Sequence, residues 1–218
     1  MEAMKAFVIT IEGHDLSNQA AERCIESGAR HGVEVIKWRA TTPDDNPVSL
    51  FRAKGLNPNG FGESYSRTIN CMAAFLSHLS LWRHAADTDE DVFILEHDAV
   101  FVNRIPNINT RNSVISMGKP SYGKFNTPDT MFNPVKLMSK PYFPGAHAYV
   151  VSKDAAPVIV EAAKERAAPT DLFFSNKNFA FLYEYYPWPV EAMDSFTTIQ
   201  NRTGCIAKHN YGEEYKIV

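Results

Sequence analysis

The sequence contains few cysteines and no apolar run long enough to cross a membrane. The three cysteines, Cys24, Cys71 and Cys205, are widely spaced, which fits neither a disulfide framework nor a zinc pattern and favours a reducing, cytoplasmic compartment. No apolar run approaches the roughly 20 residues that span a bilayer, and the first residues lack the basic-then-apolar order of a signal peptide. We therefore expect a cytoplasmic protein without a transmembrane segment.

Positive charge is not clustered, and several common catalytic motifs are missing. The formal net charge is -3, with Lys and Arg spread along the chain, whereas nucleic-acid binding needs a concentrated basic patch. We expect no nucleic-acid partner. The patterns GxGxxG, the Walker loop, GxSxG and HExxH do not occur, so the dinucleotide-binding, P-loop, α/β-hydrolase and zincin classes lack support.

The N-terminal part has the pattern of a β-α-β unit. Residues 6–11 are β-branched and aromatic and predict a buried strand. Asp15 or Ser17 can cap a helix that ends near Gly32. Residues 33–38 alternate as a second strand, and a unit of this length predicts parallel pairing.

The pattern continues with further helices and strands. Apolar residues at helical spacing predict a helix over residues 69–86. Residues 92–95 are apolar on both faces, which is typical of the centre of a parallel sheet. Strands are also predicted over 112–117 and 146–151, and Asp154 can cap a helix that ends near residue 166.

Two long segments rich in Pro and Gly, residues 41–66 and 118–144, are predicted to be loops. Loops of this length within a compact domain are often functional. The expected fold class is α/β, with one domain over residues 1–202 and a polar tail over 203–218.

The triplet Glu96-His97-Asp98 directly follows the strand predicted over residues 92–95. Open α/β sheets place their ligands at the carboxyl ends of strands. Since side chains alternate along a strand, Glu96 and Asp98 are expected to point the same way and His97 the opposite way. Two carboxylates on one face suit Mg²⁺ or Mn²⁺, which can neutralise a diphosphate. Acids that follow a strand are also common on solvated surfaces, so spacing alone leaves both interpretations open.

Two pairs of residues on predicted elements are further candidates. Ser77 and His78 lie beside the apolar stripe of the long helix, where they either face a ligand pocket or satisfy hydrogen bonds in the core. Gly145 and His147 lie at the start of a strand. A glycine there either lets the backbone approach a ligand closely or simply begins the strand.

Acidic residues in the C-terminal third are candidates for a catalytic base. Asp171 precedes an apolar run, where its pKa can be raised so that it serves as a general base. An Asp in this position is also a common helix N-cap. Glu191 and Asp194 are further candidate acids. His209, in the tail, is either a metal ligand or a surface histidine.

Several blocks of the sequence occur in an informative order. Residues 73–82 (AAFLSHLSLW) are similar to a GC-x-L-S-H-L-x-L-W block, residues 93–101 (FILEHDAVF) to an ILEDDV-x-F block, and residues 145–152 (GAHAYVVS) to a G-T-x-A-Y-L-I-S block. Residues 7–11 match a first strand, and residues 197–199 are similar to a late S-x-I. This ordered set resembles glycosyltransferase family 25, which includes bacterial lipooligosaccharide galactosyltransferases and relatives of collagen galactosyltransferases.

The resemblance implies a GT-A-like fold, with a Rossmann-like, mostly parallel sheet flanked by helices. It also implies a nucleotide-sugar donor such as a UDP-sugar, Mn²⁺ or Mg²⁺, and inversion at the transferred sugar, of which galactose is one candidate. The implied acceptor is a glycan or lipid-linked saccharide, as in lipopolysaccharide biosynthesis, with the enzyme peripheral to the inner membrane. The site residues implied are the metal ligands Asp98, Glu96 and His209, the catalytic acids Asp171 and Glu191, and the donor-binding residues Thr10, Ser77, His78, Glu96, His97, Gly145 and His147.

The sequence departs from the family pattern in ways that keep other functions open. His97 replaces the middle acid of the triplet, and an imidazole there would suit Mn²⁺ better than Mg²⁺. Ala73 and Ala74 replace the Gly-Cys pair. One alternative is a non-catalytic glycan- or nucleotide-binding module. A nucleotidyltransferase is disfavoured, because residues 12–15 lack the Gly-rich basic loop that a triphosphate requires.

Overall fold

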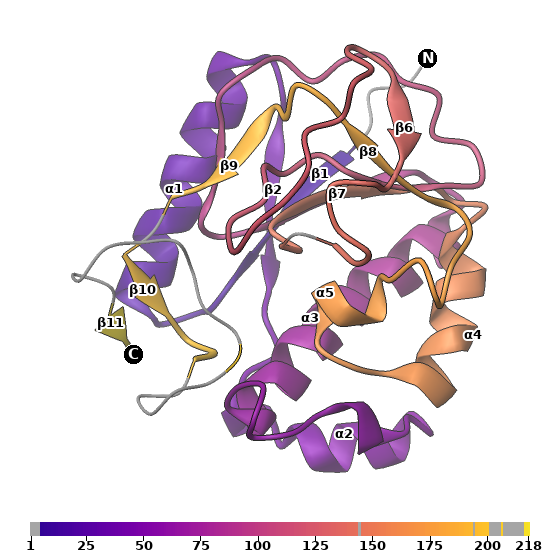
Figure 1. Ribbon diagram of the computed structural model, residues 1–218. Helices are drawn as coiled ribbons and strands as arrows, with labels where there is room; N and C mark the ends of the chain where they lie inside the picture. Colours follow the sequence, from indigo (N-terminus) through magenta and orange to yellow (C-terminus); the bar gives the residue numbers. More distant parts are fainter. Residues whose placement is uncertain (1–4, 144, 194, 201–205, 207–215) are drawn as a thin grey trace.

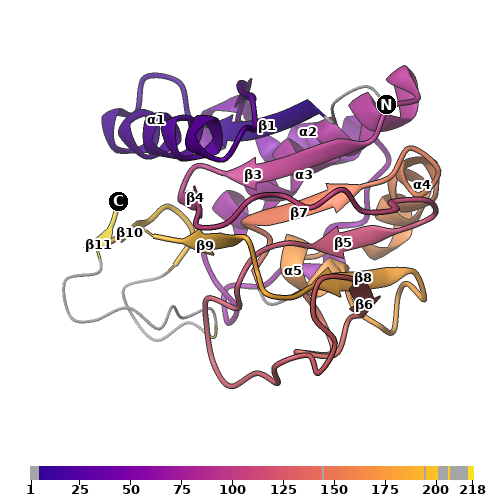
Figure 2. The same ribbon diagram turned by 90° about the horizontal axis from the view of Figure 1, so that it is seen from above.

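A seven-stranded sheet forms the centre of the computed structural model (Figure 1), which describes residues 5–143, 145–193, 195–200, 206 and 216–218. The strand order is β2-β1-β3-β7-β5-β8-β6, and Figure 2 shows most of the strands side by side in this order. The strands are β1 (Lys5–Thr10), β2 (Val35–Arg39), β3 (Val92–Glu96), β5 (Val114–Ser116), β6 (Pro134–Lys136), β7 (Ala148–Val151) and β8 (Leu182–Tyr185). Five strands run in one direction, and β7 and β6 run in the other.

Helices cover both faces of this sheet. Helix α1 packs on one face, while α3, α4, α5 and α2 lie on the other (Figure 1). The helices are α1 (Asp15–Arg30), α2 (Pro47–Ala53), α3 (Thr68–Thr88), α4 (Ala156–Arg166) and α5 (Thr170–Phe173). Two short ladders complete the fold: β4 (Ala99–Phe101) with β9 (Val190–Ala192), and β10 (Phe196–Thr197) with β11 (Lys216–Ile217).

The alternation of side chains along β3 divides the core into two layers. Val92 and Ile94 join the apolar cluster beneath α3 and α4, whereas Phe93 and Leu95 join the cluster beneath α1. All four side chains are almost completely buried. The next residue on the α3 side is Glu96, so the period of two that builds the core also places a carboxylate on that face at the end of the strand.

The structure confirms the predicted α/β class, with a mostly parallel sheet in one compact domain. β1 and β2 pair in parallel, as the β-α-β pattern indicates, and the helix predicted over residues 69–86 is α3. The prediction that residues 92–95 lie between parallel neighbours is only half right, because β3 pairs in parallel with β1 but antiparallel with β7. Within the described residues, no helix combines the length and apolarity that a bilayer span requires.

The two predicted loops contain regular structure. The segment 41–66 includes α2, which starts where the Asn46 side chain accepts a hydrogen bond from the Ser49 backbone and Pro47 occupies the first turn. The segment 118–144 includes β6, and its Pro134 is tolerated because β6 is an edge strand that pairs only with β8.

Two predicted helix caps are also wrong. Helix α1 is capped by His14, whose Nδ1 accepts a hydrogen bond from the Ser17 backbone, and not by Asp15 or Ser17. Helix α4 has Ala155 at its N-cap, without a side-chain hydrogen bond, in place of Asp154. The predicted tail lies mostly outside the described residues, but its β11 pairs with β10.

Gly60 packs against the end of α4 and is expected to be sensitive to substitution. A Cβ at Gly60 would lie 2.2 Å from the backbone oxygen of Ala167. We expect Gly60→Ala to destabilise the protein by about 1–3 kcal/mol, because a backbone atom has to move. Urea denaturation measures this. Gly62→Ala is the matched control, since its nearest neighbour would be Ser64 Oγ at 3.8 Å, and equal stability of the two variants would contradict the prediction.

Candidate functional site

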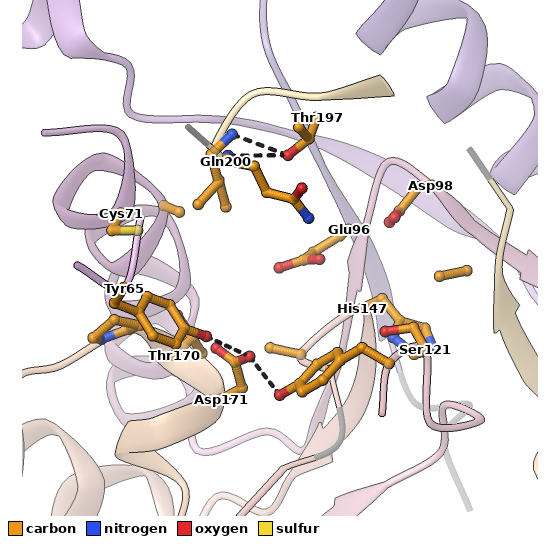
Figure 3. A pocket seen from close by; sticks show the side chains of 17 residues that line it. Tyr65, Cys71, Glu96, Asp98, Ser121, His147, Thr170, Asp171, Thr197 and Gln200 are labelled. Carbon is orange, nitrogen blue, oxygen red and sulfur yellow. Dashed lines mark hydrogen bonds between the residues drawn. The ribbon is translucent and has the colours of Figure 1, made fainter. Parts of the chain in front are cut away.

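Two adjoining pockets open where β1 and β3 end, and both are built around the same carboxylates. The Asp171 pocket is bounded by α5, the start of α3 and the strand that begins after Gly145. The His78 pocket lies between α3, the end of β1 and the residues that follow β2. The residues common to both linings are Ala74, Glu96, Asp98, Thr197 and Ile199. The two carboxylates therefore form part of a shared wall (Figure 3).

The triplet after β3 divides its side chains between different surroundings. Glu96 and Asp98 line both pockets. His97 is directed to α1, where its Nδ1 lies 3.0 Å from Ser17 Oγ. Its ring also stacks on Phe196, with centroids 5.2 Å apart. The two acids thus face the cleft together, as the alternation predicts. His97 turns toward α1 and Phe196 but also lines the His78 pocket, so the predicted separation of this histidine from the acids is only partial.

Phe196 holds the segment of residues 196–200 against the site. Its ring is stacked between His97 on one side and His14 on the other, with the His14 centroid at 6.2 Å. Residues 197–199 contribute to the His78 pocket. The backbone oxygen of Ile199 accepts hydrogen bonds from Arg67 N and Ser66 Oγ at the start of α3.

A buried chain of hydrogen bonds orients Glu96. Trp82 Nε1 donates to Tyr149 Oη at 2.9 Å, and Tyr149 Oη lies 2.8 Å from His78 Nδ1. His78 Nε2 in turn lies 3.1 Å from Glu96 Oε1. Because the indole can only donate, the tyrosine hydroxyl is free to donate its own hydrogen to His78, whose other nitrogen then donates to Glu96. This series of hydrogen bonds begins in the core at Trp82 and fixes the orientation of the Glu96 carboxylate.

The same surroundings favour the ionised form of Glu96. Burial acts to raise the pKa of Glu96, but the hydrogen bond and the electrostatic interaction with His78, with contributions from His147 and His97, outweigh it and hold the pKa below its ordinary value. Glu96 is thus a carboxylate at neutral pH with one oxygen held by His78.

Asp171 is bound by two tyrosine hydroxyl groups (Figure 3). Tyr65 Oη and Tyr122 Oη both donate to its Oδ2, at 3.0 and 2.8 Å. Burial raises the pKa of Asp171 above its ordinary value, as does the nearby charge of Glu96, while the two tyrosines act in the opposite direction. The result is a carboxylate that takes up a proton more readily than an exposed one.

Two glycines make room for His147 in the same pocket. Gly145 has a φ of 122°, a conformation that other residues rarely adopt. A Cβ added to Gly118 would lie 2.2 Å from His147 Nε2, and one added to Gly145 would lie 2.8 Å from His147 Nδ1. The small residues therefore leave space for this ring. The close approach at Gly145 is to a side chain of the protein, and its approach to a ligand stays a prediction.

The remaining predicted site residues lie in several places. Ser77 lines the His78 pocket, and its hydroxyl accepts a hydrogen bond from Thr41 N. Thr10 is outside both linings, because its neighbours Ile9 and Ile11 face the His78 pocket. Glu191, on β9, is also outside them and forms an ion pair with Lys119 at 3.0 Å. Asp194 and His209 lie outside the described residues.

Sequence reasoning missed several polar residues of the Asp171 pocket, among them Ser121. Tyr65 and Tyr122 come from the two long segments predicted as loops, and their only signal was the length of those segments. Thr170 and Gln200 also line the pocket. Among the described residues, their buried Oγ1 and Nε2 atoms have no hydrogen-bond partner, so each can bind a polar ligand.

The charge of the two linings is one-sided. Three carboxylates, those of Glu96, Asp98 and Asp171, reach the pockets, while none of their described lining residues is Lys or Arg. No group of three or more His, Cys, Asp or Glu residues in the described ranges is placed to hold a metal by itself. A cation held by Glu96 and Asp98 would therefore need further ligands besides these two carboxylates.

No protein-family profile matches the chain, and no curated protein is significantly similar to it in sequence. The resemblance to glycosyltransferase family 25 thus depends on the short blocks of sequence quoted above.

Proposed function

We propose that the protein is an inverting glycosyltransferase with a GT-A-like fold, which transfers a sugar from a nucleotide-sugar donor to a hydroxyl group of a glycan or lipid-linked saccharide. The observation that carries the proposal is the pair of carboxylates, Glu96 and Asp98, in the wall shared by two pockets, with a third carboxylate, Asp171, in one of them. A two-substrate transfer needs adjoining sites for donor and acceptor with the reacting atoms between them.

The donor set of the shared wall fits a hard divalent cation. Carboxylate oxygens are ligands that Mg²⁺ and Mn²⁺ accept, and such ions are commonly held by one or two carboxylates together with water and substrate phosphates. Glu96 and Asp98 match that number. When bound, the ion would neutralise the charge of the departing diphosphate. This contribution is needed, because the described lining contains three acids and no Lys or Arg.

The residues of the chain then have separate roles. His78 keeps Glu96 in its rotamer and ionised. Asp171 accepts the proton of the acceptor hydroxyl while the oxygen forms its bond to the sugar carbon and the bond to the diphosphate breaks. A carboxylate with a raised pKa suits this role, because general bases act best when their pKa approaches the working pH. One direct displacement inverts the sugar carbon.

The proposal is tested by calorimetry with UDP and by donor hydrolysis. We expect UDP to bind in the presence of Mn²⁺ and binding to be lost on addition of EDTA. A panel of nucleotide sugars should include at least one that is slowly hydrolysed in the presence of Mn²⁺. If no donor binds or is hydrolysed, the proposal is wrong. If a nucleotide or glycan binds equally well with EDTA and no donor is hydrolysed, the chain is a binding module.

A further inference from the structure

We propose that Tyr65 and Tyr122, the latter backed by Lys140, are positioning residues that hold Asp171 with one oxygen free to receive a proton. The inference rests on the proposed function, because it assigns Asp171 to that reaction. The two tyrosines come from distant parts of the chain and together set the direction and the basicity of the buried Asp171 carboxylate.

The geometry divides the two oxygens of Asp171 into different roles. Both phenols donate to Oδ2, at 3.0 Å from Tyr65 and 2.8 Å from Tyr122. Two donors on one oxygen occupy its lone pairs and fix the plane of the carboxylate. Oδ1 is then the oxygen available to a ligand in the pocket. A single phenol would constrain rotation of the carboxylate about its Cβ–Cγ bond less strongly.

The tyrosines reach Asp171 from independent segments, and each is held in place separately. Tyr65 precedes α3, and Tyr122 follows β5. The Tyr122 hydroxyl is also within 3.2 Å of the backbone oxygen of Phe143. Both rings line the Asp171 pocket with Thr170. The hydrogen bonds from the two tyrosines therefore connect Asp171 to the segments that line its pocket, so that the pocket and the carboxylate move together.

Lys140 lies against the face of the Tyr122 ring. Its Nζ is 4.4 Å from the Tyr122 centroid and 5.7 Å from that of Tyr142, and the residue is only 8% exposed. A cation over an aromatic face draws electron density from the ring, which makes the phenol a stronger donor. Lys140 and Asp171 thus act on Tyr122 from its ring face and its hydroxyl.

Two opposing influences on Asp171 explain why donors are needed. Burial and the charge of Glu96 favour the protonated acid, which cannot act as a base. Hydrogen bonds from Tyr122 and Tyr65 favour the anion. Loss of either phenol should raise the pKa of Asp171 further, and the pH below which the enzyme loses activity should rise with it.

The test is the pH dependence of donor turnover in Tyr122→Phe and Tyr65→Phe. We expect the acid limb of the kcat profile to move up by about one pH unit, more for Tyr122→Phe, as follows from losing a hydrogen bond to a charged group. Well above that limb, kcat should stay within a few fold of wild type, and KM for the donor should not change. Lys140→Met should move the limb in the same direction by a smaller amount. Tyr142→Phe, a nearby phenol that makes no hydrogen bond to Asp171, is the matched control.

A second measurement separates this inference from the enzyme assignment. NMR titration of ¹³C-carboxyl-labelled aspartates, with the Asp171 signal assigned by Asp171→Asn, gives the pKa without any substrate. A higher Asp171 pKa in both phenylalanine variants together with a shifted acid limb supports the proposal. An unchanged Asp171 pKa overturns it whether or not the protein is an enzyme. A raised pKa with an unmoved acid limb overturns the positioning role in the reaction.

Discussion

Asp98→Asn is expected to lower metal-dependent turnover of a nucleotide sugar by about 100- to 1000-fold, the loss that removal of one well-placed electrostatic group causes in other enzymes. The amide keeps the shape of the side chain but removes the charge that a cation in the shared wall requires. The structure places Asp98 in the linings of both pockets, and Glu96 is the only other carboxylate among the described residues that the two linings share. The measurement is the initial rate of donor hydrolysis at saturating Mn²⁺, together with Mn²⁺ affinity by calorimetry.

The matched control for this substitution is Asp154→Asn, which changes an exposed Asp before α4 in the same way. It should leave both turnover and Mn²⁺ affinity unchanged. Glu96→Gln should also reduce turnover, because the amide keeps the contact to His78 but lacks the charge. Retention of more than about a tenth of wild-type activity in Asp98→Asn would show that metal binding at this wall does not support the reaction.

Trp82→Ala is expected to destabilise the protein by about 3–5 kcal/mol, as large-to-small changes of buried aromatic residues do. Trp82 is completely buried. Its ring stacks on Phe173 at 5.2 Å and meets Phe75 and Phe174 edge to face. The substitution leaves a cavity between α3 and α5. It also removes the hydrogen-bond donor to Tyr149, which begins the series of hydrogen bonds that orients Glu96.

Urea denaturation measures this loss, and a second substitution separates its two causes. Trp82→Phe keeps most of the ring volume but removes the indole N–H, so it should cost less and report mainly on the hydrogen bond. Trp188→Ala is a comparison at a partly exposed indole, where the cost should be lower. A loss below about 1 kcal/mol for Trp82→Ala would contradict the packing described for α3 and α5.

The helices and strands whose apolar residues have a regular spacing could be predicted from the sequence. The apolar run over residues 92–95 correctly predicts that β3 is buried on both faces. Helix α3 follows from the spacing of its apolar residues. The direction in which two strands pair does not follow from the pattern of residues within either strand. The antiparallel insertion of β7 between β3 and β5 depends on chain reversals that no local pattern contains.

The site was predictable where a residue lies on a regular element or directly beside one. Glu96 and His78 lie on β3 and α3, and the sequence brings them into consideration because their neighbours have a clear period. Tyr65 and Tyr122 do not, since each lies in a segment with no period and meets Asp171 only through tertiary packing. Thr10 shows the opposite problem. It belongs to a correctly predicted strand, but strand position alone did not indicate which residues face the cleft.

Because Glu96 and Asp98 border both pockets, a ligand in either pocket lies against the same two carboxylates. A ligand in one pocket that changes the charge or the rotamer of either acid alters the surface offered to the second ligand. By thermodynamic linkage the second ligand then alters the affinity for the first by the same factor. Such a change at the shared wall would couple the two pockets. The order in which two ligands arrive does not change their combined free energy of binding.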